Sequence, residues 1–337
     1  MTTSNITTVR LGNTGPTVGR VGLGTMGMSG DIYGASDDAE SIATIHDALD
    51  SGANLIDTGD FYGAGHNEQL VGKAIADRPR EDVALSVKFG ALRGPGGTWG
   101  GVDNRPAALR NFLIYSLQRL GVDYVDIYRP ARLDPSVPIE DTVGAIADLV
   151  EAGYVRHIGL SEVGADTIRR AAAVAPIADL QIEYSLISRG IEAEILPVTR
   201  ELGIGITAYG VLSRGLLSES VRAGTPLGGN DYRAHTPRFQ GENLVRNLEL
   251  VEALAKVAAQ HDISVAQSAI AWVLSRGTDI VPIIGARRRD RWAETVGALD
   301  IGLTEGDLAA IEAAVPAERV AGTRYAEAQM AMLDSER

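Results

Sequence analysis

Short runs of apolar and β-branched residues alternate along the chain with longer stretches in which apolar residues recur every three or four positions. The short runs are typical of buried strands, and the longer stretches are typical of helices with one apolar face. Eight strands are predicted in this way, at residues 20–25, 54–58, 83–88, 122–128, 155–161, 179–184, 205–209 and 280–285. Because a helical pattern follows each strand, the sequence predicts an α/β fold of the (β/α)8, or TIM barrel, type.

The helices predicted between the strands carry start and stop signals. Several begin at Asp, Pro or Asn and end at Gly, as helices commonly do. They include residues 37–51, 66–77, 105–120, 138–152 and 164–175. No Pro- or Ser-rich linker and no shift in composition interrupts the alternation, so we expect residues 1–337 to form a single domain.

Several segments add to a plain barrel. Residues 7–19 are predicted to form an N-terminal β-hairpin that covers the N-terminal end of the barrel. Residues 215–242 form a long Gly- and Pro-rich loop after strand seven, and loops of that length are usually functional. Residues 243–277 hold two helical patterns where one is expected, and an irregular tail at 317–337 follows the helical pattern at 304–314.

The composition favours a protein that binds a small molecule. Of the 337 residues, 45% are hydrophobic, enough for a large core, yet no apolar run approaches the roughly 20 residues of a membrane span. Lys and Arg number 31 against 44 Asp and Glu, and the resulting charge of -13 argues against a nucleic-acid partner. The chain has no Cys, its five His show no metal-ligand spacing, and its first residues do not resemble a signal peptide. We therefore expect a cytoplasmic protein without a metal site or a membrane partner.

Polar residues end several of the apolar runs. In a barrel of this type the C-terminal ends of the strands meet on one rim, which carries the active site. The residues concerned are Asp57, Lys88, Ser161, Glu162, Gln181 and Tyr209, with Tyr62 in the loop after the second strand. Any one of them has an ordinary explanation, such as a solvated strand end or a helix cap, but their coincidence on one rim predicts a catalytic site.

A basic tract follows the eighth strand, from Gly285 to Arg291, and leads into a helical pattern at 290–300. In such barrels this loop often holds a phosphate, because backbone N–H groups at a helix N-terminus and arginine side chains both bind anions. The alternative is a solvated basic face that neighbouring acidic residues neutralise. The position after the eighth strand favours the phosphate site.

These residues carry a resemblance to a known family. The segments GANLIDTGDFYGAGHNEQLVGKAI (52–75), VKFG (87–90), VDYVDIY (122–128), IGLSE (158–162) and ITAYGVLSRGLL (206–217) make the chain similar to the aldo-keto reductase superfamily. The resemblance covers nearly the whole chain. It implies a TIM barrel that uses NADPH to reduce a small-molecule carbonyl substrate, an aldehyde or a ketone, to an alcohol.

Within this resemblance, Asp57, Tyr62 and Lys88 match three of the family's four catalytic residues. Tyr62 would protonate the carbonyl oxygen while hydride arrives from the nicotinamide. A phenol with a pKa near 10 is a poor acid at neutral pH, so we expect the Lys88 ammonium to lower the pKa of Tyr62. Asp57 would orient Lys88 and hold it charged.

The resemblance also implies which residues bind NADPH or NADP+. The expected contacts are Ser161, Glu162, Gln181 and Tyr209 for the nicotinamide and its carboxamide, Gly210, Leu212 and Arg214 for the diphosphate, Arg287, Arg291, Glu294 and Thr295 for the adenosine end, and Thr25, Met26, Asp57 and Gly285 elsewhere. Arginine near the 2′-phosphate favours NADPH over NADH. The chain departs from the family at Glu162 and Thr295, where many members carry Asn.

The larger departure concerns the fourth catalytic residue. The family usually has histidine in a pattern L-H-R-V-D-P at the end of strand four, and this chain has Ala131 in that place. A methyl group cannot orient a carbonyl or support an oxyanion, as the imidazole does. His66 or Arg129 would then supply the missing donor, or a bound water would, or the protein binds NADPH without competent reduction.

The missing histidine keeps a second function open. The chain is either a reductase or a catalytically weak, NADPH-binding regulatory subunit, like the channel-associated members of the superfamily that also lack this histidine. The dinucleotide fingerprint G-x-G-x-x-G at residues 22–27 is a weak signal, since no helical pattern follows it at once.

Overall fold

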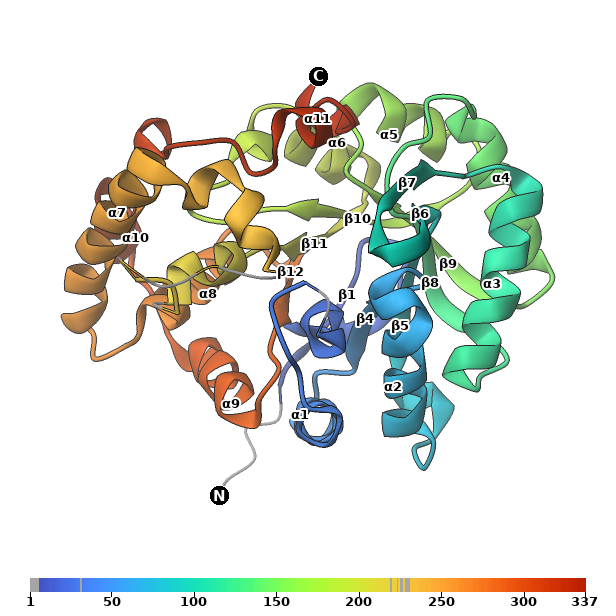
Figure 1. Ribbon diagram of the computed structural model, residues 1–337, viewed down its shortest axis with the longest axis horizontal. Helices are drawn as coiled ribbons and strands as arrows, with labels where there is room; N and C mark the ends of the chain where they lie inside the picture. Colours follow the sequence, from blue (N-terminus) through green and yellow to red (C-terminus); the bar gives the residue numbers. More distant parts are fainter. Residues whose placement is uncertain (1–5, 31, 219, 223, 225–226, 228–230) are drawn as a thin grey trace.

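Eight parallel strands form a closed barrel with helices packed around its outside (Figure 1). The computed structural model describes residues 6–30, 32–218, 220–222, 224, 227 and 231–337. Around the barrel the strands are β3 (Gly22–Gly24), β4 (Leu55–Gly59), β5 (Ala84–Phe89), β8 (Val125–Pro130), β9 (Val155–Ser161), β10 (Ile177–Glu183), β11 (Gly205–Tyr209) and β12 (Ile280–Gly285). Strand β12 pairs with β3, which closes the barrel and confirms the predicted (β/α)8 fold.

The strands are buried between the barrel interior and the surrounding helices. Every residue of β4, β5 and β10 is buried, which is why these segments have apolar runs rather than strict alternation. The surrounding helices are α1 (Asp38–Asp50), α2 (His66–Ile75), α3 (Pro106–Leu120), α4 (Ile139–Glu151), α5 (Ala165–Ala172), α6 (Ile195–Leu202), α8 (Val265–Ser275) and α9 (Arg289–Gly297). Helix α1 begins where the Asp37 side chain accepts a hydrogen bond from the Glu40 N–H, as its start signal predicts.

The N-terminal hairpin closes the N-terminal end of the barrel, as the sequence predicts. Its strands are β1 (Thr8–Arg10) and β2 (Thr17–Gly19). Between them, Leu11 packs with interior side chains of several barrel strands, and the Asn13 N–H donates to the Gly203 carbonyl ahead of β11. Gly12 has a φ of +60°, and a Cβ there would lie 2.5 Å from a backbone oxygen, so only glycine allows this close approach.

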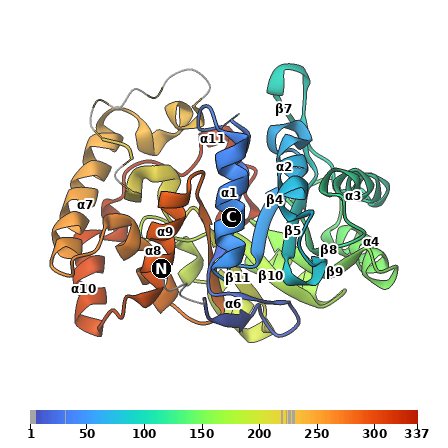
Figure 2. The ribbon, with the colours of Figure 1, turned by 90° about the horizontal axis from the view of Figure 1, so that it is seen from below.

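Further segments extend the barrel on one flank and over its top. The two helices predicted within 243–277 are α7 (Gly241–Ala259) and α8, and α7 lies beside α10 (Glu305–Ala314), on the opposite flank from α3 and α4 (Figure 2). After α10 the C-terminal segment, residues 321–337, crosses the top of the barrel and contains α11 (Glu327–Met330) (Figure 1). Within the predicted loop 215–242, the described parts include short 3-10 helices at Tyr232–His235 and Pro237–Phe239, whereas 219, 223, 225, 226 and 228–230 lie outside the described residues.

One pair of strands has no counterpart among the predicted elements. Strands β6 (Ala91–Arg93) and β7 (Trp99–Val102) form an antiparallel hairpin directly after β5. The Gly-rich sequence between them resembles a loop, and strands of three and four residues leave little periodicity to detect. This hairpin stands at the C-terminal rim and brings Trp99 to the candidate site described below.

The barrel interior contains a buried ion pair. Arg129 on β8 and Asp179 on β10 are fully buried, with 2.8 Å between Nη1 and Oδ2. Arg129 also donates to Thr207 and to Ser86, and burial raises the pKa of Asp179 despite the nearby guanidinium. Gly159 gives the pair room, since a Cβ there would lie 2.8 Å from the Asp179 Oδ1. Arg129 therefore belongs to the interior of the barrel.

We predict that Arg129→Leu lowers the free energy of unfolding by about 3–5 kcal/mol, because the Asp179 carboxylate then stays buried without its cation. Urea unfolding followed by circular dichroism measures the loss. The double variant Arg129→Leu with Asp179→Leu removes both charges and should recover most of it. A single variant as stable as the wild type would show that the ion pair does not govern the stability of the interior.

Candidate active site

A buried carboxylate organises the C-terminal end of the barrel. Asp57 on β4 lies beside Ser86 on β5, and its carboxylate accepts hydrogen bonds from the Lys88 ammonium, from Ser86 Oγ at 2.7 Å and from Gln181 Nε2 at 2.8 Å. Asp57 and Lys88 are 4% and 5% exposed, so the ion pair is shielded from water. Burial lowers the pKa of Lys88, and Asp57 opposes this shift. Three of the predicted site residues thus meet at one carboxylate.

Tyr62 lies directly above this ion pair. It begins the short 3-10 turn after β4, is buried, and has its ring centroid 5.0 Å from the Lys88 nitrogen. Gly59 lies beside the ring, where a Cβ would make an ordinary contact with Tyr62 at 3.4 Å and a tighter one with Phe61 at 3.2 Å. The structure therefore brings together the three residues that match the family's catalytic positions.

The expected effect of Lys88 on Tyr62 is a point of correction. The sequence led us to expect a lowered pKa, but burial, followed by the charge of Asp57, raises the pKa of Tyr62 well above 10. The first group that acts in the opposite direction is Arg132, a residue that the sequence analysis did not single out. A fully enclosed phenol keeps its proton because desolvation penalises the phenolate more than nearby cations favour it.

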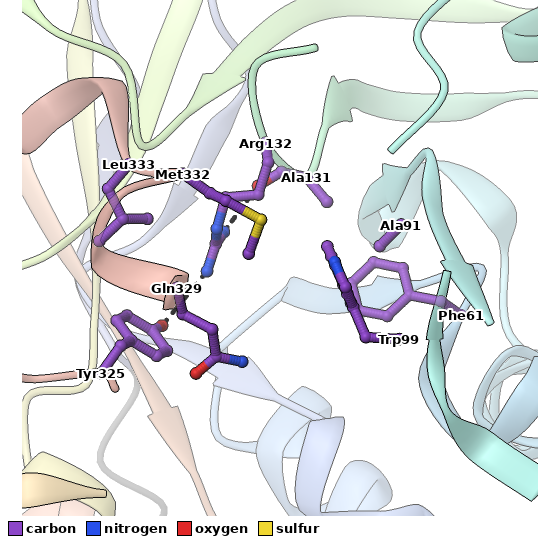
Figure 3. A pocket seen from close by; sticks show the side chains of 9 residues that line it. All are labelled: Phe61, Ala91, Trp99, Ala131, Arg132, Tyr325, Gln329, Met332 and Leu333. Atoms are coloured by element: carbon purple, nitrogen blue, oxygen red, sulfur yellow. Dashed lines mark hydrogen bonds between the residues drawn. The ribbon is translucent and has the colours of Figure 1, made fainter. Parts of the chain in front are cut away.

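A pocket opens next to the position of the missing histidine, and Phe61 on its wall has its ring centroid 4.8 Å from that of Tyr62. The pocket has a volume of about 90 Å³, with Phe61, Trp99 and Ala91 on one side and the C-terminal segment on the other (Figure 3). Its lining residues are Phe61, Ala91, Trp99, Ala131, Arg132, Tyr325, Gln329, Met332 and Leu333. The Ala131 methyl group faces this space, and the Arg132 guanidinium points across it toward Tyr325 (Figure 3).

The two residues suggested as substitutes for the histidine lie elsewhere. His66 contacts Ser29 and Asp38, each at 3.1 Å, and is not among the residues that line the pocket. Arg129 is held inside the barrel by Asp179. The residue that does line the pocket, Arg132, follows Ala131 directly in the sequence, and this adjacency was the signal available for it.

Four of the residues expected to contact the cofactor lie at the end of the barrel that carries Asp57. Gln181 is bound to Asp57, and Thr25 donates to the Asp57 carbonyl and to Asn67. Ser161 is buried at the end of β9, and Met26 lies in a 3-10 turn after β3. These positions surround the Asp57 cluster, as expected of residues on one rim.

Glu162 anchors the C-terminal segment. Its carboxylate accepts five hydrogen bonds: two from Arg324 at 2.9 and 2.5 Å, one each from the Tyr209 and Ser335 hydroxyls at 2.7 Å, and one from a backbone N–H at 3.1 Å. Burial would raise the pKa of Glu162, but Arg324 outweighs it, so the pKa is about 2. The Glu162 carboxylate therefore anchors Arg324 and, with it, the C-terminal segment. The sequence analysis did not identify Arg324 as its partner because Arg324 lies in the irregular tail.

The segment after β11 has an unusual backbone. Ser213, Arg214 and Gly215 have φ values of 44°, 55° and 94°, and the N–H groups of Ser213 and Gly215 donate to the carbonyls of Gly210 and Leu212. Gly210 is also left-handed, and Leu212 is half-buried beside it. The Arg214 guanidinium donates to the Arg324 carbonyl and lies 3.5 Å from Glu183. The Ser213 hydroxyl is buried and has no hydrogen-bond partner among the described residues.

The basic tract after β12 is largely paired with local acceptors. Arg287 donates to three backbone carbonyls at residues 33–35, and Arg291 pairs with Glu294 at 2.9 Å. Glu40 of α1 accepts from the first N–H of α9, and the Thr295 hydroxyl is bound within α9. Gly285 at the end of β12 is exposed, with open space where a side chain would stand.

Two kinds of feature are missing from the described part of the chain. Its residues contain no group of three or more His, Cys, Asp or Glu side chains placed to hold a metal ion. None of its helices combines the length and the apolar character needed to cross a membrane.

Comparison with known proteins decides the family. The model described as Aldo/keto reductase family matches residues 20–316. The chain belongs to this family. As an aldo-keto reductase it is an oxidoreductase of carbonyl compounds.

Similar proteins agree over nearly the whole length of this aldo-keto reductase. The chain is 43% identical over 326 residues to "Probable aldo-keto reductase 1" of Glycine max, covering 96% of this chain and 93% of that protein. The solved glycerol dehydrogenase of Gluconobacter oxydans is 30% identical, with a TM-score of 0.82 over 93% of this chain and 95% of that one. The holo form of an aldo-keto reductase from Bacillus halodurans is 26% identical, with a TM-score of 0.77 over 93% and 97%.

We predict that Arg324→Met releases the C-terminal segment, because Glu162 then stays buried without its cation unless the segment moves away and admits water. Hydrogen exchange followed by mass spectrometry should show exchange in residues 321–337 faster by about tenfold or more. Arg319→Met, an exposed arginine ahead of the segment, is the matched control. Unchanged exchange in the Arg324 variant would contradict the anchoring role.

Proposed function

We propose that this aldo-keto reductase reduces an aldehyde or a ketone to an alcohol with hydride from NADPH, and that Tyr62 donates the proton. The observation that carries the proposal is the buried Asp57–Lys88 ion pair beneath Tyr62, whose ring packs edge-to-face against Phe61 on the wall of a pocket. A phenol this close to a pocket, with a buried cation below it, can give a proton to an oxygen bound in the pocket.

The segment after β11 fits the diphosphate of such a cofactor. The N–H groups of Ser213 and Gly215 donate to the carbonyls of Gly210 and Leu212, so the donors that this segment offers to a diphosphate are side chains. The buried Ser213 hydroxyl without a described partner supplies one such donor, and Arg214 supplies a guanidinium beside it. We assign Gly210, Leu212 and Arg214 to this subsite.

The tract after β12 fits the adenosine end. Arg287 and Arg291 bring two guanidinium groups to the start of α9, where helix N–H groups also favour an anion. Glu40 now accepts from the first N–H of α9, and Glu294 pairs with Arg291. A bound phosphate would replace these two carboxylates. Open space at Gly285 leaves room for the cofactor beside this tract.

The proton transfer follows from the surroundings of Tyr62. Burial raises the pKa of Tyr62, which keeps the phenol protonated at neutral pH but makes it a weaker acid, so the transfer needs nearby cations to stabilise the phenolate. NADPH, when bound, supplies the hydride to the carbonyl carbon. As the carbonyl oxygen becomes an alkoxide it takes the Tyr62 proton, and the Lys88 ammonium stabilises the phenolate left behind. Asp57 keeps Lys88 in place for this role.

The Ala131 position supports the alternative of a catalytically weak NADPH-binding regulatory subunit, since no imidazole faces the pocket there. The intact Asp57–Lys88 pair favours the enzyme, because a protein that only binds the cofactor does not need a buried cation beneath a tyrosine. The two functions differ in turnover rather than in cofactor affinity.

We predict that Tyr62→Phe lowers kcat for a reactive aldehyde such as 4-nitrobenzaldehyde by about 100-fold or more, because the proton donor is lost. The Kd for NADPH, measured by fluorescence titration, should change less than about twofold, since the ring remains. Tyr115→Phe, on an exposed tyrosine, is the matched control. A Tyr62 variant with wild-type kcat would refute the donor role, and a wild-type protein that binds NADPH without turnover would support the regulatory alternative.

We also predict that Arg291→Ala raises the Kd for NADPH by about tenfold while the Kd for NADH changes less than about threefold, because a charge-assisted bond to the 2′-phosphate is lost. Titration of both cofactors on one preparation gives the ratio. Arg288→Ala removes an exposed arginine that pairs with Asp290 and serves as the control. Equal losses for the two cofactors would reject the 2′-phosphate assignment.

A further inference from the structure

The pocket beside Tyr62 is apolar apart from one end. Phe61, Trp99, Met332 and Leu333 supply aromatic and aliphatic surface, and Arg132 is the one charged residue among the described residues that line it. A cation in such surroundings attracts an anion more strongly than it would in water, because less solvent screens the pair. The pocket thus has apolar walls that suit a hydrocarbon group and a single basic residue at one end.

Arg132 carries N–H hydrogen-bond donors that its described neighbours do not use. A guanidinium carries five N–H groups. Arg132 donates to the Ala131 carbonyl at 2.6 Å and to the Tyr325 hydroxyl at 3.2 Å, and its other N–H groups have no hydrogen-bond partner within the described ranges. Both acceptors are uncharged oxygens, so Arg132 keeps N–H groups for a further acceptor.

The neighbouring arginines differ from Arg132 in this respect. Arg324 pairs with Glu162, and Arg214 lies 3.5 Å from Glu183. These two guanidinium groups and that of Arg132 all lie within 6 Å of the Tyr325 ring centroid, yet no described carboxylate lies within 4 Å of Arg132. Burial would lower the pKa of Arg132, but Tyr325, Tyr209 and Glu162 raise it, so the chain keeps this guanidinium charged without a direct ion pair, and its unused N–H groups can bind an anion from outside the chain.

We propose that the substrate is an aldehyde or ketone that also carries a carboxylate, and that Arg132 binds this carboxylate. The inference rests on the proposed reductase function and specifies its substrate class. A planar guanidinium matches the two oxygens of a carboxylate, and a single arginine in the lining balances the charge of a monoanion rather than that of a phosphate dianion. The carbonyl end of the same molecule would lie toward Tyr62.

A competing role for Arg132 gives a different result. If its guanidinium polarised the carbonyl oxygen in place of the missing imidazole, it would act on every substrate, charged or neutral. If it binds a carboxylate, its loss affects charged substrates alone, and mainly through KM. A matched pair of substrates separates these roles.

The experiment compares 4-carboxybenzaldehyde with 4-nitrobenzaldehyde, which has nearly the same shape but no charge, on the wild type and on Arg132→Gln. We expect the variant to lose about tenfold or more in kcat/KM for the carboxylate, through KM, and less than about threefold for the nitro compound. Arg132→Lys keeps the positive charge but loses the planar pair of N–H donors, so its kcat/KM for the carboxylate should lie between that of the wild type and that of Arg132→Gln. Arg246→Gln, at an exposed helix position, should change neither.

Equal losses for both aldehydes, or no loss for either, would overturn the proposal, and so would a wild type that turns over the nitro compound but not the carboxylate. Wild-type turnover of the nitro compound tests the reductase function itself. Should neither aldehyde be reduced, calorimetry of 4-(hydroxymethyl)benzoate and 4-nitrobenzyl alcohol with the enzyme and NADP+ still decides: tighter binding of the carboxylate that Arg132→Gln abolishes supports the proposal, and equal binding refutes it.

Discussion

The Asp57 carboxylate is the group on which the rest of the site depends. It holds Lys88 beneath Tyr62, and through Ser86 it connects to the Arg129–Asp179 ion pair deeper in the barrel. Inside a protein such bonds are stronger than in water, and an unpaired member is correspondingly costly. The position of the proton donor is therefore fixed by strands on several sides of the barrel rather than by the loops above it.

The sequence was sufficient to predict the parts of the molecule that repeat or that lie close together along the chain. Buried parallel strands leave apolar runs and their helices leave a three- to four-residue period, so all eight strands of the barrel were found close to their observed positions. Asp57 and Lys88 each stand at or near a strand end, and parallel strands in a closed barrel bring such ends to one rim.

Features that depend on contacts between distant segments were not predictable. Glu162 and Arg324 are 162 residues apart, and nothing in the periodicity of either segment indicates the other. The pKa of Tyr62 was expected to be lowered because the expectation considered the Lys88 cation but not how deeply Tyr62 is buried. Arg132 was overlooked since an arginine in a loop is usually solvated, and only the arrangement of the C-terminal segment shows that it faces a pocket.

The tether between Glu162 and the C-terminal segment has a consequence for the order in which the molecule is assembled. A ribosome makes residues 321–337 after all eight strands, so the barrel can fold while one wall of its pocket is still missing. Until Arg324 reaches Glu162, the space beside Tyr62 lies open to bulk water. A barrel whose C-terminal segment has not docked has Asp57 and Lys88 on its strands, but it lacks the wall of the pocket that residues 321–337 supply.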